Sequence, residues 1–268
     1  MKPVIKTVLL SCALLIASST ALPVPHRAHS AETTDQKTTI HCGTFVFNNL
    51  YEPSADANAP PKGFFADVMR GASARLGINV KFSEIGSFAT GFEELKSGRF
   101  DMLCATLESH AVNYDKMLFS TALFYDPVYV YGDAKRDYAE IKTLGDINQP
   151  KWRIAGMDGE LGGYYGPIVF PKAIMHMVGQ MSAVGNIMTD MFSGKADMVM
   201  LTKAAADAYQ KTNPETLKQI ITEPIAMYPV RFVFKPDDIK MKLMFDSVFE
   251  DMRAEGVIDR IKKENGIE

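Results

Sequence analysis

The chain has 268 residues, of which 47% are hydrophobic, so it can bury one large core or two smaller ones. Its 29 Lys and Arg residues and 32 Asp and Glu residues give a formal net charge of −3. This near balance argues against a nucleic-acid-binding protein, which would carry a strongly basic patch.

The N-terminus has the pattern of a secretory signal peptide. Lys2 and Lys6 precede an apolar run at 8–17, which is followed by small residues at 18–21, then by Pro23 and Pro25, and then by a second stretch of mostly small residues at 28–31. The apolar run is too short to span a bilayer, and no second long apolar run follows it. We therefore expect a signal peptide at 1–31, cleaved after Ala21 or near Ala31 on export, and a mature periplasmic chain that is not inserted in the membrane.

The first half of the chain alternates between strand and helix patterns. Apolar residues at helical spacing predict a helix over 63–77, bounded by glycines. The other elements expected here are strands at 40–47, 80–82 and 101–105 and a helix at 90–96. Such alternation is typical of a parallel sheet covered by helices.

The second half repeats this pattern after a predicted crossing strand at 128–132. The segment LKSGRFDMLCAT in the first half is echoed by FSGKADMVMLT in the second. The elements expected are a strand at 153–157, a loop with Gly159, Gly162 and Gly163, a helix at 185–193, a strand at 198–201, a helix at 203–211, a return crossing at 230–234 and helices at 238–255 and 257–263. This repetition predicts two α/β units joined by two crossings.

Two segments, GFFADVMRGASARLG and FEELKSGRFDMLCATLESHAVNYDKMLFSTALFYDPVYVYG, carry a family resemblance. In order, spacing and loop length the chain resembles, from Thr39 onward, the bacterial family 3 extracellular solute-binding proteins, the receptors of amino-acid-type ABC importers. The resemblance implies an α/β, two-lobed periplasmic-binding-protein type II fold, in which each lobe is a parallel-dominated sheet flanked by helices and two hinge crossings join the lobes. It implies lobe 1 at 39–128 plus 231–268 and lobe 2 at 129–230, with a ligand cleft between them.

The first-lobe residues that bind an α-amino acid in this family are exchanged here. The family's arginine, which makes a bidentate bond to the ligand carboxylate, corresponds to Asn113. The family's carboxylate-binding threonine corresponds to Glu108, and Thr106, just after the signature strand, is a further candidate contact. The resemblance therefore implies a site that has lost its cation.

The second lobe departs from the family in the same direction. The family reads Gly-Thr-Thr at a helix N-terminus that binds carboxylate, whereas this chain reads Gly159-Glu160-Leu161. The family's ammonium-binding aspartate corresponds to Thr202. A ligand carboxylate beside Glu108 and Glu160 would meet like charge, at a cost of roughly several kcal/mol. We therefore predict a small polar ligand, cationic or neutral, that is not a standard amino acid.

An alternative for either glutamate is open at this point. Each could point to solvent at the rim of the cleft, or pair inside the protein with Lys203 or Arg231. Two aromatic residues, Tyr51 and Phe88, fall at positions where the family has rings near the ligand. A ring against a ligand cation contributes about 0.5–2 kcal/mol, and the alternative for each ring is a place in the core.

Cys42 and Cys104 lie on strands that the resemblance makes neighbours. Export permits a disulfide between them, whereas two buried thiols would serve as small apolar groups. The sequence leaves both interpretations open.

The resemblance implies a receptor that delivers a small-molecule ligand to an ABC transporter permease. Two alternatives keep the fold. The first is an accessory protein of a periplasmic quinoprotein dehydrogenase, because such accessory proteins also carry a cysteine in the first strand. The second is a sensory receptor. A third is a dehydratase with Glu160 as its acid/base group. We expect a binding protein and not an enzyme, with no cofactor and no metal, because the 5 His are scattered without zinc spacing.

Overall fold

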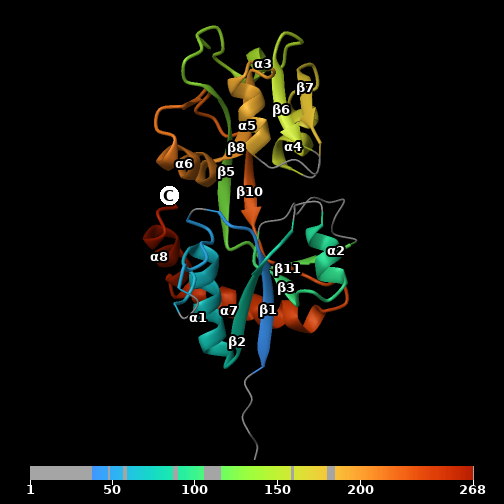
Figure 1. Cartoon of the computed structure of the whole chain (residues 1–268), viewed down its shortest axis with the longest axis vertical. Coiled ribbons are helices and arrows are strands. Elements are labelled where there is room, and N and C mark those ends of the chain that lie inside the picture. The colour runs from blue at the N-terminus through green and yellow to red at the C-terminus, as the bar shows by residue number, and fades with distance from the viewer. Residues whose placement is uncertain are drawn as a thin grey trace, which may run out of the picture. The chain divides into compact units, whose positions relative to one another are not determined.

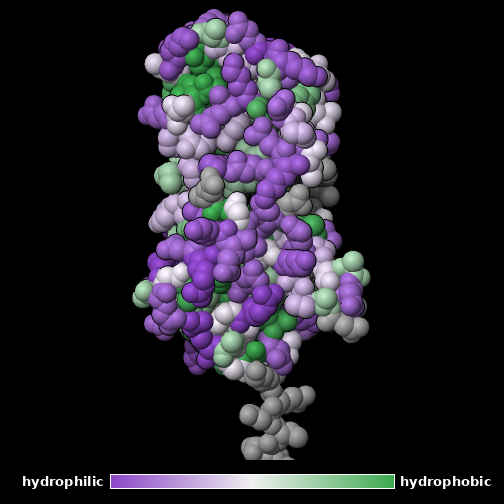
Figure 2. All heavy atoms as spheres, turned by 90° about the vertical axis from the view of Figure 1, so that its left-hand side faces the viewer, coloured by the Kyte–Doolittle hydropathy of each residue, from purple (hydrophilic) through white to green (hydrophobic). Residues whose placement is uncertain are grey.

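The computed structural model describes residues 38–47, 49–56, 59–86, 90–105, 116–157, 160–179 and 185–267. These residues form a mixed α/β structure built on two sheets (Figure 1). Within the described part, no helix combines the length and the apolar character that a membrane crossing requires. The face drawn in Figure 2 is largely hydrophilic, with small separate hydrophobic patches.

The first sheet has five strands in the order β2-β1-β3-β11-β4. Strand β1 runs parallel to β2 and to β3, whereas β11 runs antiparallel to both β3 and β4. Its strands are β1 (Thr39–Thr44), β2 (Asn79–Glu84), β3 (Met102–Leu103), β4 (Leu118–Phe119) and β11 (Val233–Phe234), and the helices of this lobe are α1 (Phe64–Leu76), α2 (Gly91–Lys96), α7 (Ile239–Ala254) and α8 (Val257–Glu264).

The second sheet has six strands, in the order β10-β5-β8-β6-β7, with β9 paired to β5. Strand β6 is parallel to β7 and β8, and β5 is antiparallel to β8, β9 and β10. Its strands are β5 (Phe124–Asp133), β6 (Arg153–Met157), β7 (Ile174–Val178), β8 (Met198–Thr202), β9 (Leu217–Gln219) and β10 (Ala226–Val230), and its helices are α3 (Leu144–Ile147), α4 (Leu161–Val169), α5 (Gly185–Phe192) and α6 (Lys203–Thr212).

The repeat in the sequence is a repeat of topology. Each sheet has a parallel trio, β2-β1-β3 in the first and β7-β6-β8 in the second, extended on one side by an antiparallel strand. The echoed sequence segments contain the corresponding strands β3 and β8. The predicted α/β fold with two lobes is therefore present, with antiparallel crossing strands added to the parallel core.

Strands β5 and β10 make the two crossings, and they pair with each other from Ala226↔Val128 to Val230↔Phe124. The boundary predicted between residues 128 and 129 lies inside β5, which pairs along its whole length with strands of the second sheet. The predicted return crossing at 230–234 covers only the last residue of β10, then Arg231 and Phe232, and then β11, which belongs to the first sheet.

Helix α1 has the bounds that its glycines predict. Gly63 has φ 102° and lies so close to Leu50 that a Cβ would be 2.6 Å from the carbonyl oxygen of that residue. Gly77 ends the helix in the left-handed conformation, at φ 66°. The apolar stripe of α1 is buried, and its Phe65 ring packs edge-on against Phe232 of the first-lobe core.

The expected loop around Gly162 and Gly163 is wrong, because both residues lie inside helix α4. A Cβ at Gly163 would be 2.2 Å from the carbonyl oxygen of Met157, and one at Gly156 would be 2.9 Å from the Gly163 nitrogen. These glycines therefore allow α4 to pack closely on β6. Close backbone approach and chain reversal favour the same residue type, so the sequence could not separate them.

A disulfide joins Cys42 on β1 to Cys104 just after β3, with a Cα–Cα distance of 5.7 Å. Both cysteines are fully buried. Of the two interpretations that the sequence left open, the structure has the disulfide.

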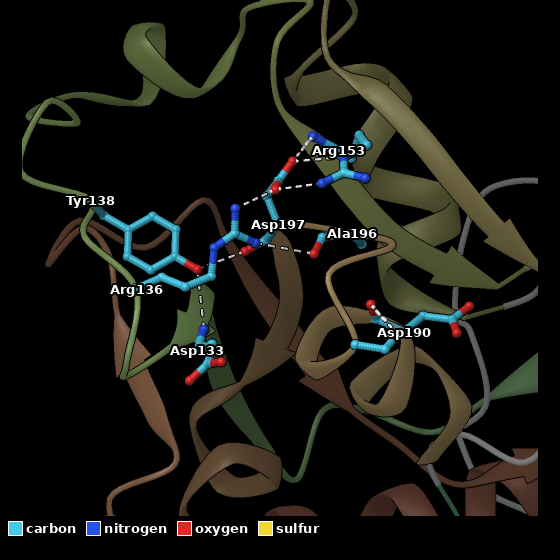
Figure 3. Close-up of polar contacts among 8 residues, drawn as sticks. Asp133, Arg136, Tyr138, Arg153, Asp190, Ala196 and Asp197 are labelled. Carbon is cyan, nitrogen blue, oxygen red and sulfur yellow. Dashed lines mark hydrogen bonds and ion pairs between the residues drawn. The ribbon is translucent and has the colours of Figure 1, made fainter.

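A buried carboxylate fixes the start of β8 in the second lobe. Arg153 binds Asp197 through two nitrogens, Nε to Oδ2 at 3.0 Å and Nη2 to Oδ1 at 2.9 Å, and Arg136 Nη2 lies 2.6 Å from Oδ1 (Figure 3). The Tyr138 hydroxyl donates to the Asp197 carbonyl at 2.8 Å. Burial alone would raise the pKa of Asp197, but the two guanidinium groups outweigh it and hold this pKa below its usual range.

Candidate functional site

The main candidate site is a pocket of about 150 Å³ lined by segments of both lobes and by the two crossing strands. Phe45 and Phe47 from the segment after β1 and Phe65 from α1 contribute apolar walls, and Phe124 on β5 adds another ring. The start of α4, the end of β8 and the start of α6 contribute the wall that carries polar groups. Apolar walls with a few convergent polar groups are the usual build of a small-molecule site.

Asp126 is the buried acid of the crossing strand. It is 4% exposed, and Tyr228 of β10 is its register partner. The inward positions of β5 otherwise hold apolar residues, such as Phe124 and Val128. The Asp126 carboxylate therefore enters the pocket from a strand whose neighbouring inward side chains are hydrophobic.

Two donors near the start of α6 contact this carboxylate. The Ala204 nitrogen donates to Asp126 Oδ1 at 3.3 Å, and the Thr202 hydroxyl also donates to this carboxyl group. Burial raises the pKa of Asp126, whereas these hydrogen bonds and the positive charge of Lys262 act in the opposite direction. The net shift is upward, so desolvation outweighs the stabilising contacts.

Glu160 is the second buried acid, and it caps helix α4. Its Oε2 accepts a hydrogen bond from the Gly162 nitrogen at 3.0 Å, and the residue is 9% exposed. Burial raises the pKa of Glu160 to about 7, although the backbone N–H groups that donate to it, with Gly162 first, favour the ionised form. The side chain is thus turned onto its own helix terminus at the pocket wall.

Thr202 lies at the corresponding terminus of α6. It is the N-cap residue, and its hydroxyl accepts a hydrogen bond from the Ala205 nitrogen at 3.2 Å. Two predicted site residues, Glu160 and Thr202, therefore line one pocket together with Asp126.

The remaining predictions have different outcomes. Tyr51 is 7% exposed, belongs to the hydrophobic core and has its ring 5.1 Å from that of Phe82, and it is not among the residues that line the pocket. Lys203, considered as a partner for a glutamate, has its Nζ 2.6 Å from Asp207. The other predicted contacts lie outside the described residues: Phe88, Thr106, Glu108, Asn113 and Gly159.

Asp126 is the site residue that the sequence analysis missed. The signal was present, because FYDPVYVYG places one acid at an inward position of an otherwise hydrophobic alternating strand. A charge there must have a partner, a ligand or a shifted pKa. Recognising it would have required the strand to begin at Phe124 and not at the predicted residue 128.

The charge of the pocket follows from these residues. Among the described residues that line it there are two carboxyl groups, of Asp126 and Glu160, and no Lys, Arg or His. In the described part of the chain there is also no group of three or more His, Cys, Asp or Glu side chains arranged to hold a metal ion.

The sequence matches a family model over most of its length. The family model of bacterial extracellular solute-binding proteins, family 3, matches residues 44–266. No curated protein matches the sequence.

Solved structures similar to this one include an ancestral arginine-binding protein bound to glutamine, with a TM-score of 0.70 at 20% identity over 87% of this chain and 99% of that chain. An amino acid ABC transporter substrate-binding protein from Streptococcus pneumoniae bound to L-arginine has a TM-score of 0.68 at 15% identity, covering 85% and 94% of the two chains. An ancestral amino acid-binding protein, a precursor of cyclohexadienyl dehydratase, has 0.69 at 18% identity, covering 84% and 94%. At these identities the likeness shows the fold.

Proposed function

Because the chain belongs to the bacterial extracellular solute-binding proteins of family 3, we propose that it is the receptor of an ABC importer for a small polar solute, cationic or neutral, that is not a standard α-amino acid. The observation that carries this proposal is the pocket in which Asp126 and Glu160 are both buried. The protein binds and releases its solute without chemical change, acts in the periplasm and presents the solute to a permease.

The two acids disfavour a ligand that carries a carboxylate. Coulomb repulsion between unit charges 4 Å apart is about 4 kcal/mol at an effective dielectric constant of about 20. A carboxylate would therefore need a cation in the wall, and the described lining residues contain none. A neutral polar group can accept or donate at Asp126 and Thr202, and a cation gains directly from Asp126.

The crossing strands suggest how binding couples to closure. Asp126 on β5 and Tyr228 on β10 both line the pocket, so a bound solute contacts the strands that join the lobes. Contacts that form only in the closed arrangement bias the equilibrium toward it. Glu108 and Asn113 remain predicted contacts from the first lobe.

A thermal-shift screen of amino acids, amines, polyamines and neutral polar solutes tests the proposal. At a concentration of about 100 times Kd, a true ligand should raise the Tm by about 5 °C or more. Pull-down of the permease on immobilised protein, with and without the best ligand, tests delivery. If no solute raises the Tm and no permease is captured, the proposed receptor function is wrong.

A further inference from the structure

The two acids of the pocket differ in what already occupies their acceptor positions. From this difference we infer that the ligand is an amine with an apolar body and no carboxylate, that its ammonium is bound by Asp126, and that Glu160 fills the anion position at the N-terminus of α4. This inference rests on the proposed function and names the ligand class of the same pocket.

Glu160 occupies a place that would otherwise attract an anion. The first N–H groups of a helix have no intrahelical partner and carry partial positive charge, so helix N-termini bind carboxylates and phosphates. At α4 the Glu160 carboxyl takes this position, accepting from Gly162 at 3.0 Å and bonded to the backbone of Leu161 and Gly163 as well. A ligand carboxylate would find those donors already used and a second acid beside it.

Asp126 has acceptor capacity left for a ligand. An ionised carboxylate offers about four lone-pair positions, and two donors, Ala204 N–H and the Thr202 hydroxyl, contact this one. The residue is 4% exposed, so water supplies little of what is missing. Of the nearby charges, Lys262 is favourable and Asp207 is unfavourable, and the pocket wall itself adds no cation from its described residues. An ammonium group brings both donors and the missing positive charge.

The rest of the pocket fits an apolar body. Four phenylalanines, at 45, 47, 65 and 124, line it, and Leu161 and Leu201 add aliphatic surface. A hydrocarbon ligand buried against such rings gains about 25 cal/mol of binding free energy per Å² of apolar surface removed from water. The faces of the rings also attract a cation. A solute that is polar all round, such as a sugar, would leave its hydroxyl groups unsatisfied against these walls.

Two matched ligand series test the inference by calorimetry on the protein purified after export and processing in its host. The first series shares an aromatic body: 2-phenylethylamine, 2-phenylethanol, 3-phenylpropionate and phenylalanine. The second shares an aliphatic body: pentylamine, pentanol, hexanoate and norleucine. In at least one series the amine should bind most tightly, with the carboxylate at least about tenfold weaker.

The Asp126→Asn variant then assigns the ammonium position. It should lower the amine affinity at least about tenfold and leave the alcohol of the same series within about twofold, which also shows that the variant is folded. Asp207→Asn is the matched control, because it removes the same charge from a residue whose carboxylate pairs with Lys203 outside the pocket lining. It should change the amine affinity by less than about threefold.

Three results would overturn the inference: a carboxylate or amino acid that binds as tightly as the matching amine, no binding by either amine, or full amine affinity in Asp126→Asn. The ranking of ligands on the wild-type protein does not depend on any variant being folded. Binding of phenylalanine or norleucine without the amines would refute the amine inference while leaving a solute receptor in place.

Discussion

The main-chain nitrogen of Ala204, in the first turn of α6, donates a hydrogen bond to Oδ1 of Asp126 on β5 at 3.3 Å. This contact brings a carboxylate of the crossing strand to a helix N-terminus, where the helix dipole favours negative charge. Burial nevertheless raises the pKa of Asp126, so the arrangement holds an incompletely compensated acid in the pocket wall.

Replacing Asp126 by Asn should not destabilise the protein at pH 7. Because burial raises the pKa of Asp126 in the folded state above its ordinary value of 3.8, the stabilising contribution of this carboxyl group is full below that value and is lost as the pH rises through the folded pKa. The amide keeps an acceptor for Ala204 and carries no charge. Urea unfolding at pH 7 should give a free energy of unfolding equal to or above that of the wild type, and a loss of more than about 1 kcal/mol would contradict this account.

Replacing Asp197 by Asn should have the opposite effect on stability. Its pKa is held below the usual range in the folded state, so its contribution is present above the unfolded pKa and is lost as pH falls through the folded pKa. Arg136 and Arg153 are more than one third exposed, so water partly replaces the lost partner and we expect a loss of about 2 kcal/mol at pH 7. Unfolding by urea measures this loss. Ligand affinity should be unaffected, since none of the three residues lines the pocket.

The pH dependence of stability should change when Glu160 is replaced by Gln. The pKa of Glu160 is about 7 in the folded protein against an ordinary value of 4.5, so its stabilising contribution is full below pH 4.5 and is lost as the pH rises through about 7. Across that window the wild type should lose on the order of 3 kcal/mol relative to Glu160→Gln, whose side-chain carbonyl still accepts from Gly162. Urea unfolding of both proteins at pH 4.5, 6 and 7.5 measures this loss. If the difference between their free energies of unfolding does not change with pH, Glu160 is not desolvated.

Glu160→Ser should open the N-terminus of α4 to an external anion. Serine is a favoured N-cap residue, so the helix should keep its cap while losing the internal carboxylate. The affinity for 3-phenylpropionate or hexanoate should rise by about tenfold over the wild type, as measured by calorimetry. Glu160→Gln provides the control, because it removes the charge but still fills the position. Equal carboxylate affinity in the wild type and Glu160→Ser would mean that Glu160 does not exclude anions.

Loss of the disulfide should lower stability substantially. Cys42 and Cys104 are separated by 62 positions in sequence, a loop for which chain-entropy arguments give about 4 kcal/mol at 25 °C. The double variant Cys42→Ala/Cys104→Ala should therefore show a free energy of unfolding lower by about 2–4 kcal/mol in urea. Reductant should destabilise the wild type and leave the double variant unchanged. Equal sensitivity of both proteins to reductant would show that the effect lies elsewhere.

Local patterns in the sequence predicted most helices and most strands, but not helices α3 and α4. Helix α1 is an example, since apolar spacing and the glycines at 63 and 77 depend only on neighbouring residues. The echo of LKSGRFDMLCAT in FSGKADMVMLT predicted the repeated unit because similar local patterns form corresponding strands, here β3 and β8. Strands β4, β7 and β9 and most of β10 were not predicted either. Strands β4 and β9 have only two or three residues, too few to show a periodicity.

What the sequence by itself determined is therefore the class of fold, the order of most of its elements, the family and, through the resemblance, the acids Glu108 and Glu160 at positions where the family has threonine. Only the tertiary structure decided where those groups point: Glu160 turns onto the N-terminus of α4, Tyr51 packs against Phe82, and Asp126 meets Ala204 from another element. The physical reason is that helices and strands depend on contacts within a few residues. The partners of a buried carboxyl group, by contrast, depend on which distant segments the completed fold brings within hydrogen-bonding distance.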